Sequence, residues 1–314
     1  MFMQGWINNP AAVEKSVARL IEDRFTGIIS GDHPIKGAFD GKTSAYAWKA
    51  EEVLFGKRLK SWNQTRGTCT SKGNGRAAQD TMLLDVAIKK DGGSWPGEQV
   101  ASEPIYALSR VEIGGGQISG DGSIGAWCAQ ALMKFGVMFR KVYTVGGNTV
   151  DLTQENDDIA AKWGSPRSGL PDWMEPIAKE HPIQDVALVN DLDRALDVLS
   201  TWRTIAVCSN QGFAMRRSSD GSCTPTGRWD HCMEARGVIV LKNGEPKVPI
   251  QNSWADYLGG EFQVETLNDG VVTLPEGCFL ASTDVFGRML RQGDSFAFDK
   301  AKGFAPRKLV WEFV

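Results

Sequence analysis

The chain lacks the features that mark membrane, secreted and nucleic-acid-binding proteins. Its 314 residues contain no run of about 18 apolar residues, so no segment is expected to span a membrane. The stretch from Met1 to Pro10 has neither a basic region nor a long apolar region, so the sequence predicts no secretion signal and favours a cytoplasmic location. The net charge is only −3, and acidic and basic residues are mixed along the chain, which argues against a nucleic-acid-binding surface.

Cysteine is also scarce, with six residues in the whole chain. That number is too small for a disulfide scaffold in a chain of this length, and reduced thiols are expected where no secretion signal is predicted. Cys208, Cys223 and Cys232 lie near His231 in the sequence but lack the close spacing of a zinc site. We therefore predict no metal and no other cofactor, with a Cys208–Cys223 disulfide as an alternative use of two of these thiols.

What the chain does contain is a change from helical to strand-like patterns along its length. Apolar residues recur at helical spacing in residues 10–25, 77–89, 102–111, 124–135 and 190–202. Short β-type runs follow at 204–208, 236–241, 247–251, 261–264 and 278–281, with an Asn243-Gly244 hairpin signal between two of them. This order predicts an α+β fold. We divide the chain into an N-terminal extension (1–50), a helical part (51–165), a β part (166–290) and a C-terminal tail (291–314).

Three positions far apart in the chain carry the residue types of a thiol active site. Cys69 lies where a loop meets a helix, and a helix N-terminus favours the thiolate form of cysteine. The chain has only three histidines, and His231 is the one that precedes a strong strand able to fix its ring. Asn252 ends a neighbouring strand, and adjacent strands lie about 4.8 Å apart, so its side chain can reach His231. We therefore expect Cys69, His231 and Asn252 to form a nucleophile, its base and the group that orients the base.

The residues around these positions resemble the motif blocks of papain-like cysteine peptidases. The blocks occur in the order of that family, and the resemblance covers roughly residues 50–290. A glycine loop and the segment after it also resemble the family's substrate-facing glycines and the residues that follow them. The matching stretches are Asn63-Gln64, Gly67-Thr68-Cys69, Gly114–Gly116 with 124–135, Asp230-His231, Gly237, Asn252-Ser253-Trp254 and Gly259–Phe262.

The resemblance implies a two-lobed fold, with a helical left lobe, an antiparallel β-barrel-like right lobe and the active site in the cleft between them. It implies a cysteine endopeptidase in which Cys69 attacks the carbonyl of a peptide substrate and His231 acts as general base and acid. Asn252 would hold the imidazole, and Gln64 would complete the oxyanion hole.

The resemblance also implies residues that bind substrate or protect the site. Trp254 would shield the contact between His231 and Asn252 from water. The loop of Gly114, Gly115 and Gly116 would lie along the peptide backbone of the substrate. These roles complete the set of site residues that we expect.

The sequence departs from the family pattern close to the nucleophile. Gln64 lies five residues before Cys69, where the family usually has six, and Thr70 replaces the usual aromatic residue. Gly73 and Gly75 fall in a helix that is normally continuous, and each weakens a helix by up to about 1 kcal/mol relative to alanine. About 50 residues precede the resembling region, fewer than the family's long helical propeptide, so zymogen control is not predicted.

These departures leave two other classes of function open. One is a structural or assembly protein that retains the fold, as some papain-like proteins of tailed phages do, with a virion location. Residues 1–50 and 291–314 would then be partner-binding extensions. The other is an amidase that acts on cell-wall peptides with the same Cys–His chemistry.

Overall fold

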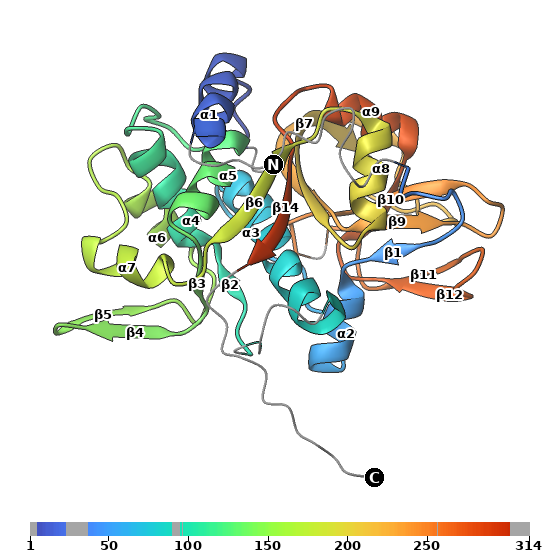
Figure 1. Ribbon diagram of the computed structural model, residues 1–314, viewed down its shortest axis with the longest axis horizontal. Coiled ribbons are helices and arrows are strands. Elements are labelled where there is room, and N and C mark those ends of the chain that lie inside the picture. Colours follow the sequence, from blue (N-terminus) through green and yellow to red (C-terminus); the bar gives the residue numbers. More distant parts are fainter. Residues whose placement is uncertain (1–4, 23–36, 90–94, 96, 256, 302–314) are drawn as a thin grey trace, which may run out of the picture.

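A computed structural model describes residues 5–22, 37–89, 95, 97–255 and 257–301, with most helices in one half of the molecule and most strands in the other (Figure 1). The helix α3 (Cys69–Leu84) lies between the halves and packs against helices on one side and strands on the other. The predicted α+β fold is confirmed, and the position of α3 means that one helix touches both halves.

The helices begin and end close to the predicted positions. Helix α1 begins at Pro10 as predicted and ends at Glu22, and residues 23–25 of the prediction lie outside the described residues. The helix predicted at 77–89 begins earlier, at Cys69, and passes into a π-helical turn over Asp85–Lys89. The other helices are α2 (Trp48–Phe55), α4 (Ser102–Leu108, followed by a π-helical turn over Ser109–Ile113), α5 (Gly125–Lys134), α6 (Asp157–Trp163), a 3₁₀ turn over Asp172–Met174, α7 (Glu175–Ala178), α8 (Leu192–Ser200) and α9 (Thr283–Leu290).

An antiparallel sheet forms the β half, with strand order β1-β9-β10-β8-β7-β14-β6 and β13 paired to β10. The Asn243-Gly244 turn joins β9 and β10, as the hairpin signal predicted. The sheet strands are β1 (Ala45–Tyr46), β6 (Ile183–Leu188), β7 (Thr204–Phe213), β8 (Pro225–Ala235), β9 (Gly237–Val240), β10 (Pro246–Gln251), β13 (Cys278–Ser282) and β14 (Phe296–Ala301). Short pairs lie outside it: β2 (Val100–Ala101) with β3 (Met138–Phe139), β4 (Val142–Val145) with β5 (Asn148–Asp151), and β11 (Phe262–Glu265) with β12 (Val271–Leu274).

Gly73 explains why α3 tolerates glycine in its first turns. A Cβ atom added at this position would lie 2.7 Å from the Cys232 sulfur and 3.1 Å from the Cys232 backbone on β8. Glycine therefore allows α3 to approach the strand that carries His231 more closely than any other residue would. The helix remains continuous through Gly73 and Gly75, so the helix propensity lost here is offset by packing against the sheet.

Strand β8 covers residues where no strand was predicted, so His231, expected to precede a strand, lies within one, and buried ion pairs hold the end of this strand. Arg236, just after the strand, is fully buried and contacts Glu51 at 2.7 Å and Asp80 at 2.6 Å. Arg76 joins the same cluster through Glu51 at 2.7 Å. Removing one partner of such a buried pair costs about 3–5 kcal/mol. The cluster therefore fixes α2 and α3 against the end of β8 that follows His231.

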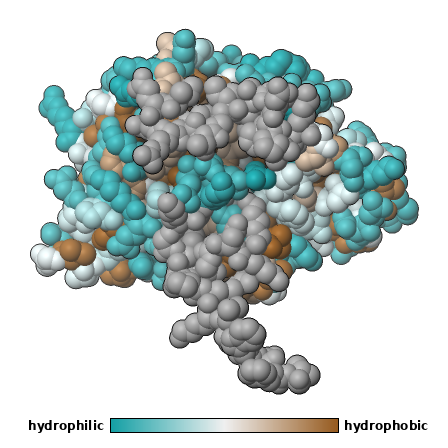
Figure 2. All heavy atoms as spheres, viewed as in Figure 1, coloured by the Kyte–Doolittle hydropathy of each residue, from teal (hydrophilic) through white to brown (hydrophobic). Residues whose placement is uncertain are grey.

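Hydrophilic residues cover most of the described surface on the face shown in Figure 2, and hydrophobic residues occur there in small separate patches. In the described ranges no helix is long and apolar enough to cross a membrane. The large apolar side chains that are exposed are spread over several elements: Val53, Val142, Val145, Met215, Leu267 and Val271.

Candidate active site

Cys69 is the first residue of α3, and its side chain is fully buried. Burial raises the pKa of the Cys69 thiol well above its ordinary value, although the nearby backbone N–H groups of Cys232 on β8 and of Gly5 act in the opposite direction. The thiol is therefore held next to the strand of His231, but in its neutral form.

His231 and Asn252 meet as the sequence predicted. The Nε2 atom of His231 lies 2.9 Å from Oδ1 of Asn252, which also accepts the backbone N–H of Ser253 at 2.7 Å. Because a backbone N–H can only donate, this second bond identifies the Asn252 atom as the amide oxygen. His231 must then carry its proton on Nε2, and the lone pair of the neutral ring is on Nδ1. Among the described residues, Nδ1 of this buried ring has no hydrogen-bond partner.

Aromatic side chains enclose the His231 ring. Trp254 stacks on it with ring centroids 4.4 Å apart and an angle of 25° between the planes. Trp229 packs edge-on against Trp254 at 4.8 Å. Burial lowers the pKa of His231 to about 4, with the Asn252 hydrogen bond acting in the opposite direction. The ring is therefore neutral near pH 7, and Trp254 covers one of its faces.

Gln64 lies in the loop before Cys69, and the Asn252-Ser253-Trp254 segment holds this loop. The Gln64 backbone N–H donates to the Ser253 carbonyl at 2.8 Å, and the Ser253 hydroxyl donates to the Gln64 side-chain oxygen at 3.0 Å. Asn63 also pairs with Trp254 through an antiparallel bridge. The loop that carries the nucleophile and the segment that orients the base are thus hydrogen-bonded to each other.

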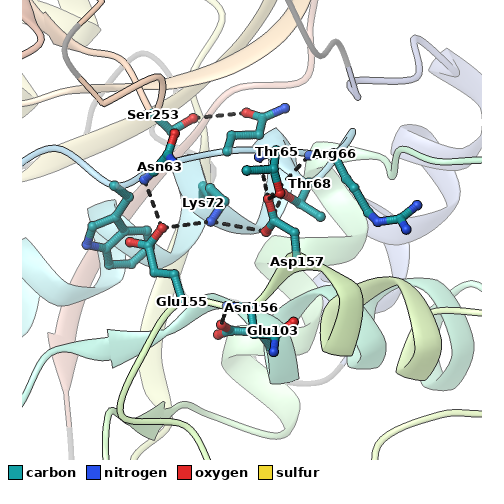
Figure 3. A network of polar contacts seen from close by, with 12 residues as sticks. Asn63, Thr65, Arg66, Thr68, Lys72, Glu103, Glu155, Asn156, Asp157 and Ser253 are labelled. Atoms are coloured by element: carbon teal, nitrogen blue, oxygen red, sulfur yellow. Dashed lines mark hydrogen bonds and ion pairs between the residues drawn. The ribbon is translucent and has the colours of Figure 1, made fainter.

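A carboxylate holds the other side of the loop (Figure 3). The side chain of Asp157, at the start of α6, accepts the backbone N–H of Thr65 at 2.6 Å and the hydroxyl of Thr68 at 3.0 Å. Lys72 on α3 is fully buried and contacts Asp157 and Glu155 at 3.2 Å each. Burial raises the pKa of Asp157, but Lys72 and the loop N–H groups outweigh it, and the net pKa is lowered. Asp157 therefore stays ionised while it shapes the loop.

A segment near the N-terminus covers the thiol. We call Gly5–Ile7 the covering segment. The N–H groups of Gly5 and Trp6 donate to the Asp230 carbonyl at 3.1 Å, and the N–H of Ile7 donates to the Ser123 carbonyl at 2.9 Å. Ser123 returns a bond from its own N–H to the Gly5 carbonyl at 2.9 Å. The covering segment thus binds the helical half through Ser123 and the β half through Asp230, next to His231.

The glycine loop predicted to bind substrate packs against other parts of the chain, as the contacts of Gly114 and Gly116 show. Gly115 and Gly116 adopt positive φ angles of 65° and 66°, and a Cβ atom at Gly116 would lie 2.5 Å from the Pro166 carbonyl oxygen. Gly114 packs against Trp127 in the same way. The loop residue that pairs with the covering segment is Ser123 instead. Substrate binding by Gly114–Gly116 stays a prediction.

Sequence reasoning did not identify Ser123 or Asp157 as parts of the site, and it named Asp230 only as the neighbour of His231 in a motif block. Ser123 and Asp230 act through their backbones, so their side-chain types carry no signal. Asp157 lies 88 positions after Cys69 in sequence number, within a polar stretch that indicated only a loop. The nearest available signal was the Asn156 N-cap of α6, which marks a helix start but not what that helix holds.

The other cysteines do not form the alternative sites that were considered. All six cysteines are free, so no disulfide joins Cys208 and Cys223. The described ranges contain no group of three or more His, Cys, Asp or Glu side chains arranged to hold a metal ion.

Comparison with known proteins gives structural relatives but no close sequence relatives. No protein-family model matches the chain, and no curated protein matches it. Xylellain, a cysteine protease from Xylella fastidiosa, superposes with a TM-score of 0.59 and 16% identity over 95% of this chain and 96% of that protein. Procathepsin B from Trypanosoma congolense gives a TM-score of 0.49 and 10% identity over 96% and 87%. Bromelain from Ananas comosus, solved with the E64 inhibitor, gives 0.43 and 13% over 82% and 98%.

The xylellain match spans nearly the whole of both chains, which agrees with the helical half, the antiparallel sheet and the helix α3 between them. The chain therefore has the papain-like α+β fold.

Proposed function

We propose that the protein is a cysteine peptidase that cleaves peptide bonds through a thioester on Cys69. The observation that carries the proposal is the state of His231. Asn252 fixes its proton on Nε2 and leaves the basic lone pair on Nδ1, and the next residue of the same strand, Cys232, packs against α3, the helix that begins at Cys69. This is the arrangement that a thiol nucleophile needs from its base.

In the first step the Cys69 proton passes to Nδ1 of His231, and the sulfur attacks the carbonyl carbon of the scissile peptide. The C–N bond then breaks, and His231 returns the proton to the leaving amine. In the second step His231 takes a proton from water, whose oxygen attacks the thioester and releases the acid and the thiol. Asn252 holds the ring through both steps, and Trp254 keeps water away from their contact.

The oxyanion formed in each step needs hydrogen-bond donors. The Gln64 side chain and the Cys69 backbone N–H fill this role in our proposal, and one such donor contributes roughly 3 kcal/mol in related chemistry. Ser253 supports this role, because its hydroxyl donates to the oxygen of the Gln64 amide and leaves the NH₂ end as the donor.

The covering segment must leave Cys69 before a substrate can bind. With the segment in place, both Cys69 and His231 are fully buried and neutral. Opening would expose both groups to water and remove the burial that raises one pKa and lowers the other. This covered state also favours a second candidate function, a papain-fold assembly protein whose site stays closed.

Hydrolysis of a quenched fluorescent peptide library by the full chain tests the proposal. We expect cleavage that disappears in Cys69→Ala and His231→Ala and persists in Cys223→Ala, which removes a buried thiol outside the site. If Cys69→Ala cleaves as fast as the unmodified chain, the peptidase proposal is wrong. No cleavage even after the covering segment is displaced would support the assembly protein instead.

A further inference from the structure

The side chain of Trp6 occupies a buried position beside the candidate active site. It is 3% exposed and belongs to the same apolar cluster as Cys69. Its backbone belongs to the covering segment, in which Gly5 lies against the Gly67 carbonyl in the loop before Cys69. The space that Trp6 fills is therefore available to a side chain of any peptide that takes the place of the covering segment.

One polar contact defines the end of this space. The indole Nε1 of Trp6 donates to Oδ2 of Asp294 at 2.7 Å. The Asp294 carboxyl also accepts the backbone N–H groups of Gly125 at 2.8 Å and of Ala126 at 2.7 Å, at the start of α5. Asp294 is 1% exposed. A buried acceptor thus faces the inserted side chain, and an inserted group without a donor would leave it with one hydrogen bond fewer.

The hydrogen-bond partners that the described residues give Asp294 carry no positive charge. They are the Trp6 indole and the backbone N–H groups of Gly125 and Ala126. Its partners are N–H dipoles alone, and a hydrogen bond that involves a charged group is worth roughly 1.5–3 kcal/mol. A guanidinium group would supply both the N–H donors and the missing positive charge.

We infer that the space filled by Trp6 is the specificity pocket of the peptidase, and that Asp294 selects peptides whose inserted side chain ends in an N–H donor, namely arginine or tryptophan. This inference rests on the proposed function. It names the substrate class of that site, and Trp6 is the example that the chain itself provides.

A binding experiment tests the selection without requiring catalysis. The protein is the full chain with Cys69→Ala, which prevents cleavage, and with Gly5→Val and Trp6→Ala, which displace the covering segment and vacate the pocket. The probes are labelled peptides that copy residues 4–8, with tryptophan, arginine, phenylalanine or 2-naphthylalanine at the central position, and the dissociation constants come from fluorescence polarisation. Naphthylalanine has nearly the size of tryptophan but no N–H, so this pair isolates the hydrogen bond to Asp294.

We expect the tryptophan and arginine peptides to bind at least tenfold more tightly than the naphthylalanine and phenylalanine peptides. Asp294→Asn should abolish the advantage of arginine, whereas Asp299→Asn, which changes an aspartate paired with Arg203 elsewhere, should preserve it. Equal or tighter binding of the naphthylalanine peptide would overturn the inference, as would no binding of any peptide to the folded variant. If Asp294→Asn does not fold, the comparison of tryptophan with naphthylalanine decides alone.

Failure of this inference and failure of the proposed function have different signatures. If the chain cleaves peptides but shows no preference for a donor side chain, the inference is wrong and the peptidase stands. If the donor peptides bind selectively but the active chain cleaves none of them, the peptidase is wrong and the pocket is a peptide-binding site.

Discussion

Asp157 offers the sharpest test of how the nucleophile loop is held. Replacing it by alanine removes the acceptor of the Thr65 N–H and one of the two carboxylates that neutralise the buried Lys72. The neighbouring residue Asp158 provides a matched control, because it lies in the same helix turn and pairs with Arg66 at 2.7 Å, but with a side chain that is 81% exposed.

The structure sets the size of the expected difference. Breaking a buried ion pair from one side costs about 3–5 kcal/mol, and since Glu155 still contacts Lys72 we expect Asp157→Ala to lose about 3 kcal/mol of unfolding free energy. An exposed pair contributes about 0–1 kcal/mol, so Asp158→Ala should change little. Urea denaturation followed by tryptophan fluorescence measures both values at pH 7.

The same substitution should impair catalysis. A displacement of about 1 Å in the position of Gln64 or Cys69 costs about a hundredfold in rate, so kcat of Asp157→Ala should fall by about that factor while Asp158→Ala stays near the original value. Asp157→Asn keeps the shape and one acceptor, and should recover part of the activity. Equal stability and equal kcat in Asp157→Ala and Asp158→Ala would refute the role of Asp157.

The pH dependence of this effect has a defined direction. The pKa of Asp157 is lower in the folded chain than the value of about 4 that aspartate has when unfolded. Its stabilising contribution is therefore complete above pH 4 and is lost as the pH falls through the folded pKa. The stability difference between the original chain and Asp157→Ala should shrink below pH 4.

Two further substitutions at glycine test close contacts in the structure. A Cβ atom at Gly5 would lie 2.2 Å from the Gly67 carbonyl oxygen, so Gly5→Val should displace the covering segment and raise the rate at which iodoacetamide labels the active-site thiol at least tenfold. Gly260→Val, where the added group meets open space, should leave that rate unchanged. Gly73→Ala should destabilise the chain by about 1–3 kcal/mol through its clash with Cys232, although alanine favours a helix by about 1 kcal/mol. A more stable Gly73→Ala chain in thermal melts would contradict the close packing of α3 on β8.

The sequence predicted the parts of the site that depend on local order. Asn252 follows β10 as expected, and His231, expected to precede a strand, lies within β8, which pairs with β10. Adjacent strands lie about 4.8 Å apart, which brings the two side chains within reach of each other. The prediction that Cys69 lies where a loop meets a helix agrees with the start of α3, although helical spacing was recognised only from residue 77 onwards.

The parts of the fold and of the site that depend on contacts between residues far apart in the chain could not be predicted from the sequence. Gly5 reaches Asp230 across 225 positions in sequence number, and no local pattern near the N-terminus indicates where it binds. The position of Gly5–Ile7 between Ser123 and Asp230 was therefore not predicted. Phe296 and Phe298, assigned to a tail, are buried in strand β14, which lies between β7 and β6. The residues that pair with Phe296 on these strands, Ala206 and Leu188, lie 90 and 108 positions earlier in the chain.

The charged residues of the fold were misleading for a different reason. Single-sequence patterns treat Glu234 and Arg236 as marks of a surface, but here both are buried, and Arg236 contacts Glu51 and Asp80. Such a cluster of buried charges is stable only when all its members are present, and no short stretch of the sequence contains them all.

The rate at which iodoacetamide labels Cys69 tests the central claim most directly, measured by mass spectrometry from pH 5 to 9 in the Gly5→Val chain. If Cys69 and His231 form a catalytic pair, labelling at pH 6–7 should exceed that of a free cysteine at least tenfold, and His231→Ala should remove the excess. Labelling of Cys69 in the opened chain no faster than that of a free cysteine, with or without His231, would contradict the account.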